Sequence, residues 1–373
     1  MAASSPTEIV EIFAYRLRIK LKKPFITSLG ANTHAENILI RMVTADGTEG
    51  QGECSPFPSI NGESMETAYV VADYLGAALK GSDALDIASS IEKMNRAIYA
   101  NSSIKSAFDM ALYDIAAKNS GMPLWRFLGG KKDKTIATDY TVSLDTPEHM
   151  AVQAAQIKEE GFPLIKVKLG DNPLTDISRV REIRKAVGPD IPLRLDANQG
   201  WNPSGTILVL SALADMNIQH CEEPIPRWQF MDLPELKRNS PLPLMADESC
   251  CDEHDAERLI RLDACHRFNI KLGKSGGLFT AQRMLRIAEN HGIPVQLGGF
   301  LESRLAFTAA THLAFCSPQV LYYDFDTCLM FEYDPVQDGI RYLKNGIIEL
   351  SDLPGIGAHV DGEYLRTLPH KKL

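Results

Sequence analysis

Between about residue 134 and residue 326, the chain alternates short β-type runs with helical patterns. Eight β-type runs follow one another at residues 135–143, 164–169, 192–198, 218–224, 243–249, 267–273, 294–300 and 320–326. Most are separated by an amphipathic helical pattern such as "DISRVREIRKAVG". Eight successive β–α units predict a TIM-like barrel. The alternative is a doubly wound open sheet, which usually has fewer strands and a glycine-rich phosphate turn, and no such turn is found.

The segments on either side of these units have other patterns. Residues 8–20 and 37–46 alternate apolar and polar residues, which predicts antiparallel strands, and helical patterns follow at 64–80, 84–99 and 103–121. The tail returns to strand and turn patterns. We therefore predict an α/β chain with a TIM-like (β/α)7β barrel over residues 129–332, an N-terminal α+β capping domain over residues 1–128, and a C-terminal segment, 333–373, that packs on the capping domain and completes it.

Composition excludes several classes of function. A formal net charge of −9 and the lack of a Lys/Arg run argue against nucleic acid as a partner. No apolar run reaches about 18 residues, and the start "MAASSPTEIVEIF" lacks the basic and apolar regions of a secretory signal. Seven cysteines without a CxxC pair indicate reduced thiols rather than disulfides. These features predict a cytoplasmic protein without a membrane partner.

Charged residues recur near the ends of the predicted barrel strands. Lys168, Asp196, Glu222, Asp247 and Lys271 follow one another at steps of 28, 26, 25 and 24 residues, so one β–α unit separates each from the next. Functional groups in such barrels lie where the strands end. We therefore expect these side chains to converge on one point above the barrel.

The chemistry of these groups predicts a metal site between two bases. Carboxylates from three adjacent strands, Asp196, Glu222 and Asp247, form an oxygen-only site that suits Mg²⁺. Lysines in the strands before and after would flank the metal. A lysine in a desolvated pocket near other cations can have its pKa lowered and act as a base. This arrangement suits removal of a proton α to a carboxylate, with the metal stabilising the ene-diolate.

The strand "LIKVKL" (164–169) carries Lys166 and Lys168 at i and i+2, on one face of an otherwise apolar strand. A surface position on an edge strand is the simple alternative, but a closed barrel has no edges. Asp196, Glu222 and Asp247 could each cap a helix, yet all three stand in register with flanking lysines. We therefore expect that this face lines a charged active site.

The motifs "KVK", "LRLDANQGW", "EEP", "MADES" and "IKLGKSGG" resemble the muconate-lactonising subgroup of the enolase superfamily, and the resemblance covers nearly the whole chain. It implies that Lys168 and Lys271 are the acid/base pair, that Lys166 aids the substrate carboxylate, and that Asp196, Glu222 and Asp247 bind Mg²⁺. Glu222 matches the metal ligand better than Glu223 does. Asn198 would support the metal ligands without binding the metal itself, and Glu248 is interpreted in the same way.

The eighth strand narrows the reaction. Asp324 and Asp326 in "YYDFDT" resemble the DxD motif of dipeptide epimerases, which bind the free amine of the substrate, and Thr141 matches a substrate-contacting threonine. The mobile loop of the first domain corresponds to "PFITSLGANTH". Gly30 stands near the place of an arginine that binds a glutamate side chain in the best-known members, and His34 is the nearest cationic candidate.

The sequence therefore predicts a Mg²⁺-dependent epimerase of a small or apolar dipeptide, of the Ala-Ala rather than the Ala-Glu type. An even-numbered homo-oligomer is expected on general grounds. Two rivals stay open. One is a lyase or cycloisomerase on the same scaffold, such as an o-succinylbenzoate synthase or a muconate cycloisomerase. The other is a non-catalytic protein that kept the barrel.

Overall fold

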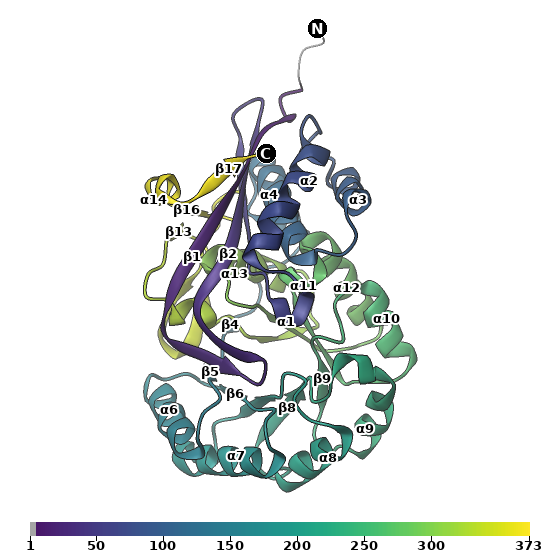
Figure 1. Ribbon diagram of the computed structural model, residues 1–373, viewed down its shortest axis with the longest axis vertical. Coiled ribbons are helices and arrows are strands. Elements are labelled where there is room, and N and C mark those ends of the chain that lie inside the picture. Colours follow the sequence, from purple (N-terminus) through teal and green to yellow (C-terminus); the bar gives the residue numbers. More distant parts are fainter. Residues whose placement is uncertain (1–4) are drawn as a thin grey trace.

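The structure is a computed structural model that describes residues 5–373, and its N-terminal part is a sheet covered by helices. The three long strands β1 (Ile9–Thr27), β2 (Gly30–Thr44) and β3 (Glu49–Cys54) pair in an antiparallel meander. The helices that follow are α1 (Pro58–Asn61), α2 (Met65–Leu79), α3 (Ile87–Ala97), α4 (Ser102–Asn119) and α5 (Leu124–Phe127). This is the predicted α+β capping unit, which lies at the top of Figure 1.

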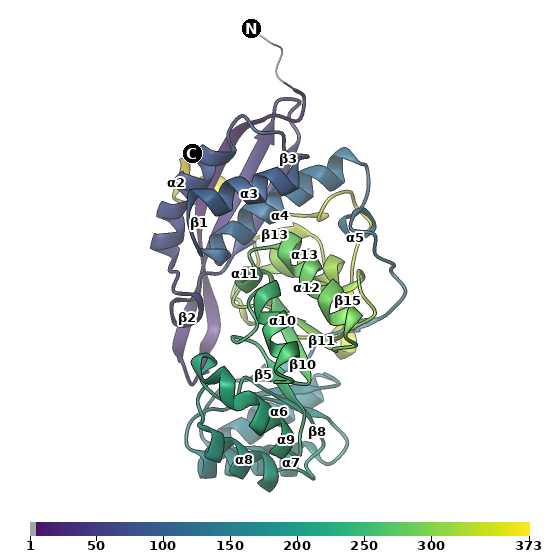
Figure 2. The ribbon, with the colours of Figure 1, turned by 90° about the vertical axis from the view of Figure 1, so that its right-hand side faces the viewer.

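The predicted (β/α)7β barrel is confirmed as one parallel eight-stranded sheet, whose strands are neighbours in chain order. Its strands are β5 (Tyr140–Val142), β6 (Ile165–Lys168), β7 (Leu193–Asp196), β8 (Ile218–Glu222), β9 (Leu244–Ala246), β10 (Arg267–Lys271), β11 (Val295–Gly298) and β12 (Val320–Tyr323). Figures 1 and 2 show the helices around the outside: α6 (Pro147–Glu159), α7 (Pro173–Val187), α8 (Pro203–Ala212), η1 (Arg227–Asp232) with α9 (Leu233–Asn239), α10 (Glu253–Arg261), α11 (Leu272–Ser275) with α12 (Leu278–Asn290), and α13 (Arg304–Ala314).

The prediction of one first strand over residues 135–143 is wrong. The chain forms β4 (Ile136–Ala137), which pairs with β15 (Ile347–Glu349) in a separate sheet, and only β5 joins the barrel. The partner changes at Thr138, whose backbone N–H donates to Gly346 O and whose hydroxyl accepts from Phe325 N at 2.8 Å. The contact with Phe325 N links the segment before β5 to the segment after β12.

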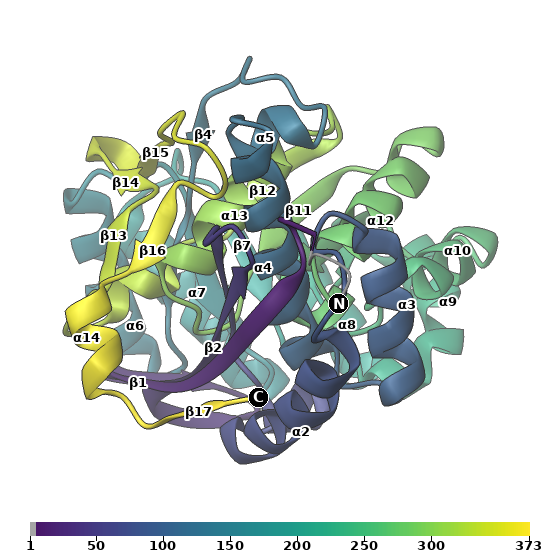
Figure 3. The ribbon, with the colours of Figure 1, turned by 90° about the horizontal axis from the view of Figure 1, so that it is seen from above.

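The C-terminal segment returns to the capping unit, as predicted for the fold. After η2 (Thr327–Met330) come β13 (Val336–Asp338), β14 (Arg341–Tyr342), η3 (Lys344–Gly346), β15, β16 (Ala358–Val360), α14 (Gly362–Thr367) and β17 (His370–Lys372). Strand β17 pairs antiparallel with β1 as the fourth strand of the capping sheet, beside it in Figure 3.

Two buried clusters of apolar side chains hold the molecule together. The smaller lies between the capping sheet and α2 and α4, and includes Ile12, Ile40 and Phe108. The larger fills the layer between the barrel strands and their helices and continues to the other face of the capping sheet. This second cluster couples the two units, because strands of one and helices of the other share it. Among the described residues, no helix is both long and apolar enough to cross a membrane.

A buried polar contact fixes the capping sheet on the barrel. Glu53 of β3 is fully buried, and its carboxylate accepts from Asn37 Nδ2 at 2.8 Å, from Ser303 N at 3.0 Å and from Ser303 Oγ at 2.6 Å. Asn37 also donates to Leu301 O at 2.8 Å. The loop after β11 is therefore tied to β2 and β3, which sets the height of the capping unit above the barrel mouth.

Buried His312 of α13 predicts a loss of stability at acidic pH. Its Nδ1 accepts from Trp125 N at 3.0 Å, and its Nε2–H donates to Ile356 O at 2.8 Å. Burial lowers the pKa of His312 from its ordinary value to about 4. As pH falls, this histidine is protonated in the unfolded chain near pH 6.5, but in the folded protein only near pH 4. The stability that the neutral His312 ring gives to the fold is therefore lost between these two pH values. That loss should reach about 3 kcal/mol of unfolding free energy.

Urea unfolding at pH 7.5 and pH 4.5 measures this contribution. His312→Gln keeps one acceptor and one donor but does not titrate, and we expect it to lose less stability between the two pH values than the wild type does. His149→Gln, at an exposed histidine, is the matched control and should keep the wild-type dependence. An equal pH dependence in the wild type and in His312→Gln would contradict the prediction.

Candidate active site

Lys166 lies at the bottom of the barrel mouth with a relative exposure of 1%. Its Nζ is 2.7 Å from Asp324 Oδ2, 2.9 Å from Glu222 Oε2 and 3.1 Å from Asp196 Oδ2. Burial opposes the charged form, but these carboxylates raise the pKa of Lys166 well above its ordinary value. Lys166 is therefore a fixed positive charge at which carboxylates of β7, β8 and the loop after β12 meet.

Lys168 and Lys271 lie on the two sides of this centre, and each contacts one carboxylate of a neighbouring strand. Lys168 Nζ donates to Asp196 Oδ2 at 2.7 Å, and Lys271 Nζ donates to Asp247 Oδ2 at 2.7 Å. The register explains the first contact, because Lys168 and Asp196 are cross-strand partners. Burial would lower the pKa of Lys271, but the Asp247 and Glu222 carboxylates raise it above its ordinary value. The lowered pKa expected of a lysine base beside a bound cation stays a prediction.

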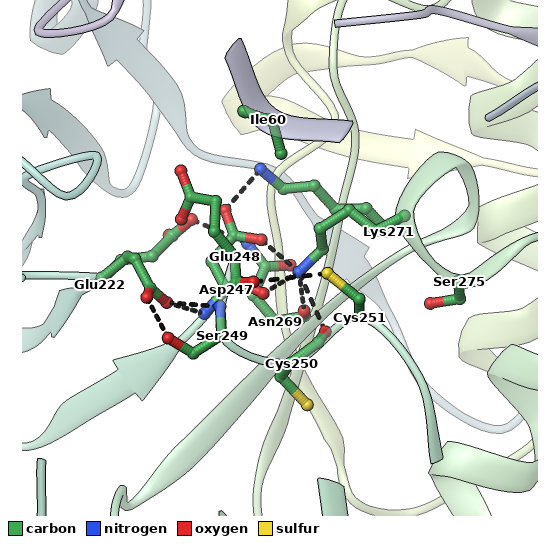
Figure 4. Close-up of polar contacts among 12 residues, drawn as sticks. Ile60, Glu222, Asp247, Glu248, Ser249, Cys250, Cys251, Asn269, Lys271 and Ser275 are labelled. Carbon is green, nitrogen blue, oxygen red and sulfur yellow. Dashed lines mark hydrogen bonds and ion pairs between the residues drawn. The ribbon is translucent and has the colours of Figure 1, made fainter. Parts of the chain in front are cut away.

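The adjacent acids Glu222 and Glu223 point in different directions. Glu222 faces the barrel interior, where it accepts from Asn269 Nδ2 at 2.9 Å and from Gln296 Nε2 at 3.1 Å. Glu223 accepts from Asp247 N at 2.7 Å and holds the turn after β9. Figure 4 shows Glu222, Asp247 and Lys271 gathered near one another, with Ile60 approaching from the capping unit.

The oxygen atoms of this site suit a hard divalent cation. Asn198 Nδ2 donates to Glu248 Oε1 at 3.4 Å, whereas Asn198 Oδ1 and Glu248 Oε2 are buried without a hydrogen-bond partner in residues 5–373. Buried polar atoms normally have a partner. Around the mouth, eight buried acids (Asp139, Asp196, Glu222, Glu223, Asp247, Glu248, Asp324 and Asp326) face five buried cations (Lys166, Lys168, Arg194, Lys271 and Lys274). This surplus of acids favours binding of a cation.

A second group of acids lies where β12 meets β5. Carboxylate oxygens of Asp139, Asp324 and Asp326 lie within 4.8 Å of one another, and in the described part of the chain no other set of three His, Cys, Asp or Glu side chains does so. Asp326 Oδ2 accepts from Thr141 N at 2.6 Å, whereas Oδ1 of Asp326 and of Asp139 has no hydrogen-bond partner among residues 5–373. The geometry thus leaves two buried carboxylate oxygens for a cation.

Three functional neighbours were missed by the sequence analysis. Arg194 Nη1 donates to Asp139 Oδ2 at 2.9 Å and to Tyr323 O at 2.9 Å, and joins β7 to the opposite edge of the sheet. Lys274 Nζ lies 2.5 Å from Asp247 Oδ1. A charge inside an apolar strand was the available signal for Arg194, which stands two residues before Asp196. Asp139 gave no signal, because it stood inside a strand predicted too long.

Five of the candidate residues line one cavity of about 40 Å³ between the capping unit and the barrel. Its polar lining includes Thr141, Lys168, Asn198, Lys271 and Asp324, and its apolar lining is Phe25, Leu29, Phe57, Ile60, Phe300 and Leu301. The predicted residue Gly30 does not line this cavity; it is exposed at the turn between β1 and β2. His34 lines a separate cavity next to Phe57.

Comparison with known proteins gives the same family along the whole chain. Residues 9–129 match the mandelate racemase/muconate lactonizing enzyme N-terminal domain, and residues 149–364 match the enolase C-terminal domain-like family. The D-Ala-D/L-Ala epimerase of Cytophaga hutchinsonii is 53% identical over 360 residues, 96% of this chain and 98% of that protein. The L-Ala-D/L-Glu epimerase of Clostridium acetobutylicum is 35% identical over 94% of this chain and 98% of its own.

A solved structure of a relative carries ligands. It is the dipeptide epimerase from Cytophaga hutchinsonii, complexed with Mg and the dipeptide D-Ala-L-Val. The TM-score is 0.97 at 52% identity, over 98% of this chain and 99% of that one.

The buried Arg194–Asp139 pair predicts a large cost for removing one partner. Arg194→Met leaves a buried carboxylate without its guanidinium, and we expect a loss of about 3–5 kcal/mol in unfolding free energy. Adding Asp139→Asn should recover part of that loss. Arg261→Met, at an exposed pair with Glu257, is the control and should cost less than about 1 kcal/mol. Denaturant unfolding of the wild type, Arg194→Met, Asp139→Asn, the double variant and Arg261→Met tests this, and additive losses in the double variant would contradict it.

Proposed function

The chain belongs to the mandelate racemase/muconate lactonizing enzyme family, and we propose on this premise that it is a Mg²⁺-dependent dipeptide epimerase that moves a proton between two lysines. The observation that carries the proposal is the single cavity whose wall contains Lys168, Lys271 and Asp324 together. One substrate in this cavity would contact two separate bases and an ammonium-binding carboxylate at once.

The acids at the β12 edge bind the free amine of the dipeptide in this proposal. Asp324 lines the cavity, and Asp326 lies behind it, held by Thr141 N. Asp324 already pairs with Lys166, and a substrate ammonium would add positive charge beside the unpartnered Oδ1 of Asp326. This group discriminates against the rival lyase and cycloisomerase reactions, because their substrates carry no ammonium for it to bind.

Lys168 and Lys271 are the acid/base pair in the proposal. Lys168 comes from β6 and Lys271 from β10, so they reach the cavity from strands on different sides of the carboxylates. One lysine takes the proton as the α-C–H bond breaks, and the other delivers a proton from its N–H to the opposite face of the carbon. Lys166 does not line the cavity. Its ammonium pairs with the carboxylates of Asp196, Glu222 and Asp324. Its charge favours a substrate carboxylate placed above it.

Asp196, Glu222 and Asp247 would hold the divalent cation, with Asn198 and Glu248 as supporting oxygen donors. The unpartnered oxygens of Asn198 and Glu248 and the surplus of buried acids fit a hard cation. When bound, Mg²⁺ supplies positive charge beside the substrate carboxylate and so favours loss of the neighbouring α-proton.

Small or apolar side chains fit the remaining walls of the cavity. Phenylalanine, leucine and isoleucine side chains make up its apolar lining, and Lys168 and Lys271 are the two cations among the described lining residues. The carboxylate of a glutamate side chain would have only Lys168 and Lys271 as cationic partners in this cavity, and it would compete with the proton transfer for them. Ala-Ala and Ala-Val types of dipeptide therefore fit better than Ala-Glu. A homo-oligomer and a cytoplasmic location stay predictions.

The first test is a screen for deuterium uptake. The protein is mixed with Mg²⁺, D₂O and pools of L,L and mixed-configuration dipeptides, and mass spectrometry detects a one-dalton gain at an α-carbon. We expect uptake into Ala-Ala and Ala-Val peptides, much less into Ala-Glu, and none after treatment with EDTA until Mg²⁺ is restored. Absence of exchange in every dipeptide, with Mg²⁺ bound, would refute the epimerase proposal and favour the cycloisomerase or lyase branch.

Asp326→Asn tests the ammonium site. Loss of a buried charge that faces an ammonium should lower kcat/KM for free dipeptides by about 10- to 100-fold. N-acetylated dipeptides should be poor substrates of both proteins, so the preference for a free amine should shrink in the variant. The control is Asp145→Asn, at a partly exposed aspartate, which should keep the wild-type preference. An unchanged preference in Asp326→Asn would show that the amine binds elsewhere.

A further inference from the structure

Each of the two cavity lysines lies under the face of one phenyl ring. Lys168 Nζ is 5.6 Å from the centroid of the Phe25 ring, and Lys271 Nζ is 5.0 Å from that of Phe300. Both rings are buried, at 8% and 6% exposure. These distances are within the range of a cation–π contact, in which the negative face of the ring attracts the ammonium.

The surroundings of Lys166 are different. Its ammonium contacts three carboxylates, and in residues 5–373 no aromatic ring lies over it. Lys168 and Lys271 each donate one hydrogen bond, to Asp196 and to Asp247. A ring face attracts an ammonium without accepting a conventional hydrogen bond, so it does not use up the N–H groups that must face a substrate. An aromatic ring therefore lies over each of the two lysines that line the cavity, and over Lys166 none does among residues 5–373.

Phe25 is held over Lys168 by two ties between the capping hairpin and the barrel. Leu144 N, after β5, donates to Ile26 O at 2.9 Å, and Ser28 Oγ donates to Ala197 O at 3.2 Å, after β7. Strand β6, which carries Lys168, lies between these two strands. The tip of the hairpin thus spans the end of β6 and places a ring above its last residue.

The close approach at this tip leaves no space for additional atoms. Gly170 follows β6 with φ +96°, and a Cβ there would lie 1.9 Å from Ala197 O and 3.1 Å from Ser28 Cβ. The loops after β6 and β7 and the hairpin therefore pack directly on one another.

Phe300 is held over Lys271 by a separate set of contacts. Its N–H donates to the Glu302 carboxylate, and its C=O accepts from Thr327 Oγ1 at 2.8 Å. On the side of the capping unit its ring stacks on Phe57, with centroids 5.6 Å apart at 28°. The backbone and the ring are both fixed, so the position of the ring face is set by the barrel and the capping unit together.

The geometry points to Phe25 and Phe300 as a matched pair of positioning residues, each of which fixes one lysine ammonium and shields it from water on one face of the substrate. This inference rests on the proposed epimerase function, and it extends that function by giving each base its own aromatic partner from a different segment. Loss of one ring should therefore impair proton transfer on one face of the α-carbon more than on the other.

Deuterium exchange into recovered substrate tests this, starting from each pure epimer of the dipeptide that exchanges fastest in the screen above. Epimerisation rates in the two directions are tied to each other by the equilibrium constant, but exchange without inversion reports the base on one face. We expect Phe25→Leu to slow exchange from one epimer about tenfold more than from the other, and Phe300→Leu to reverse that ratio. Phe25→Met and Phe300→Met replace any leucine variant that does not fold.

Phe307→Leu is the matched control, because Phe307 is a buried ring of the same barrel that lies over neither lysine. It should leave the ratio between the epimers as in the wild type. Equal slowing of both epimers in Phe25→Leu and in Phe300→Leu would overturn the inference while leaving the epimerase function intact. Absence of exchange by the wild type would instead refute the proposed function itself.

Discussion

The site depends on the balance of buried charge around Lys166. Taking an ammonium and several carboxylates out of water is costly, and the cost is offset only when opposite charges are close and well arranged. Lys166 meets carboxylates of β7, β8 and the loop after β12 within 3.1 Å. The barrel makes this possible because its strands end at one mouth. Any change that separates these strands leaves several charges buried without partners.

The other lysines use the same mouth differently. Lys168 and Lys271 each contact one carboxylate and one aromatic ring, and both line the cavity under the capping unit. The rings come from the capping hairpin and from a loop that Phe57 and Glu53 tie to the capping sheet. The capping unit is therefore part of the proposed catalytic site. It supplies apolar walls where the barrel supplies charge, and the proposed preference for small or apolar dipeptides rests on this division.

Much of the fold could be predicted from periodicity. The spacing of Lys168, Asp196, Glu222, Asp247 and Lys271 gave the order of the barrel strands, because each β–α unit advances the chain by one strand. The pattern failed at residues 135–143, where Thr138 changes the partner of the chain from one sheet to another. It also missed the pairing of Arg194 in β7 with Asp139, which precedes β5. Contacts between residues 55 positions apart leave no local signal.

The sequence by itself determined the parallel barrel, the capping sheet and the strand ends at which the charges from Lys168 to Lys271 stand, because strand period and unit length are local properties of the chain. Only the tertiary structure decided how those charges pair. It separated Glu222, which faces the interior, from Glu223, which holds a turn. It also placed Leu29 rather than Gly30 on the cavity wall and set one phenyl ring over each cavity lysine. These features depend on side-chain direction and on packing between distant segments, which local patterns do not specify.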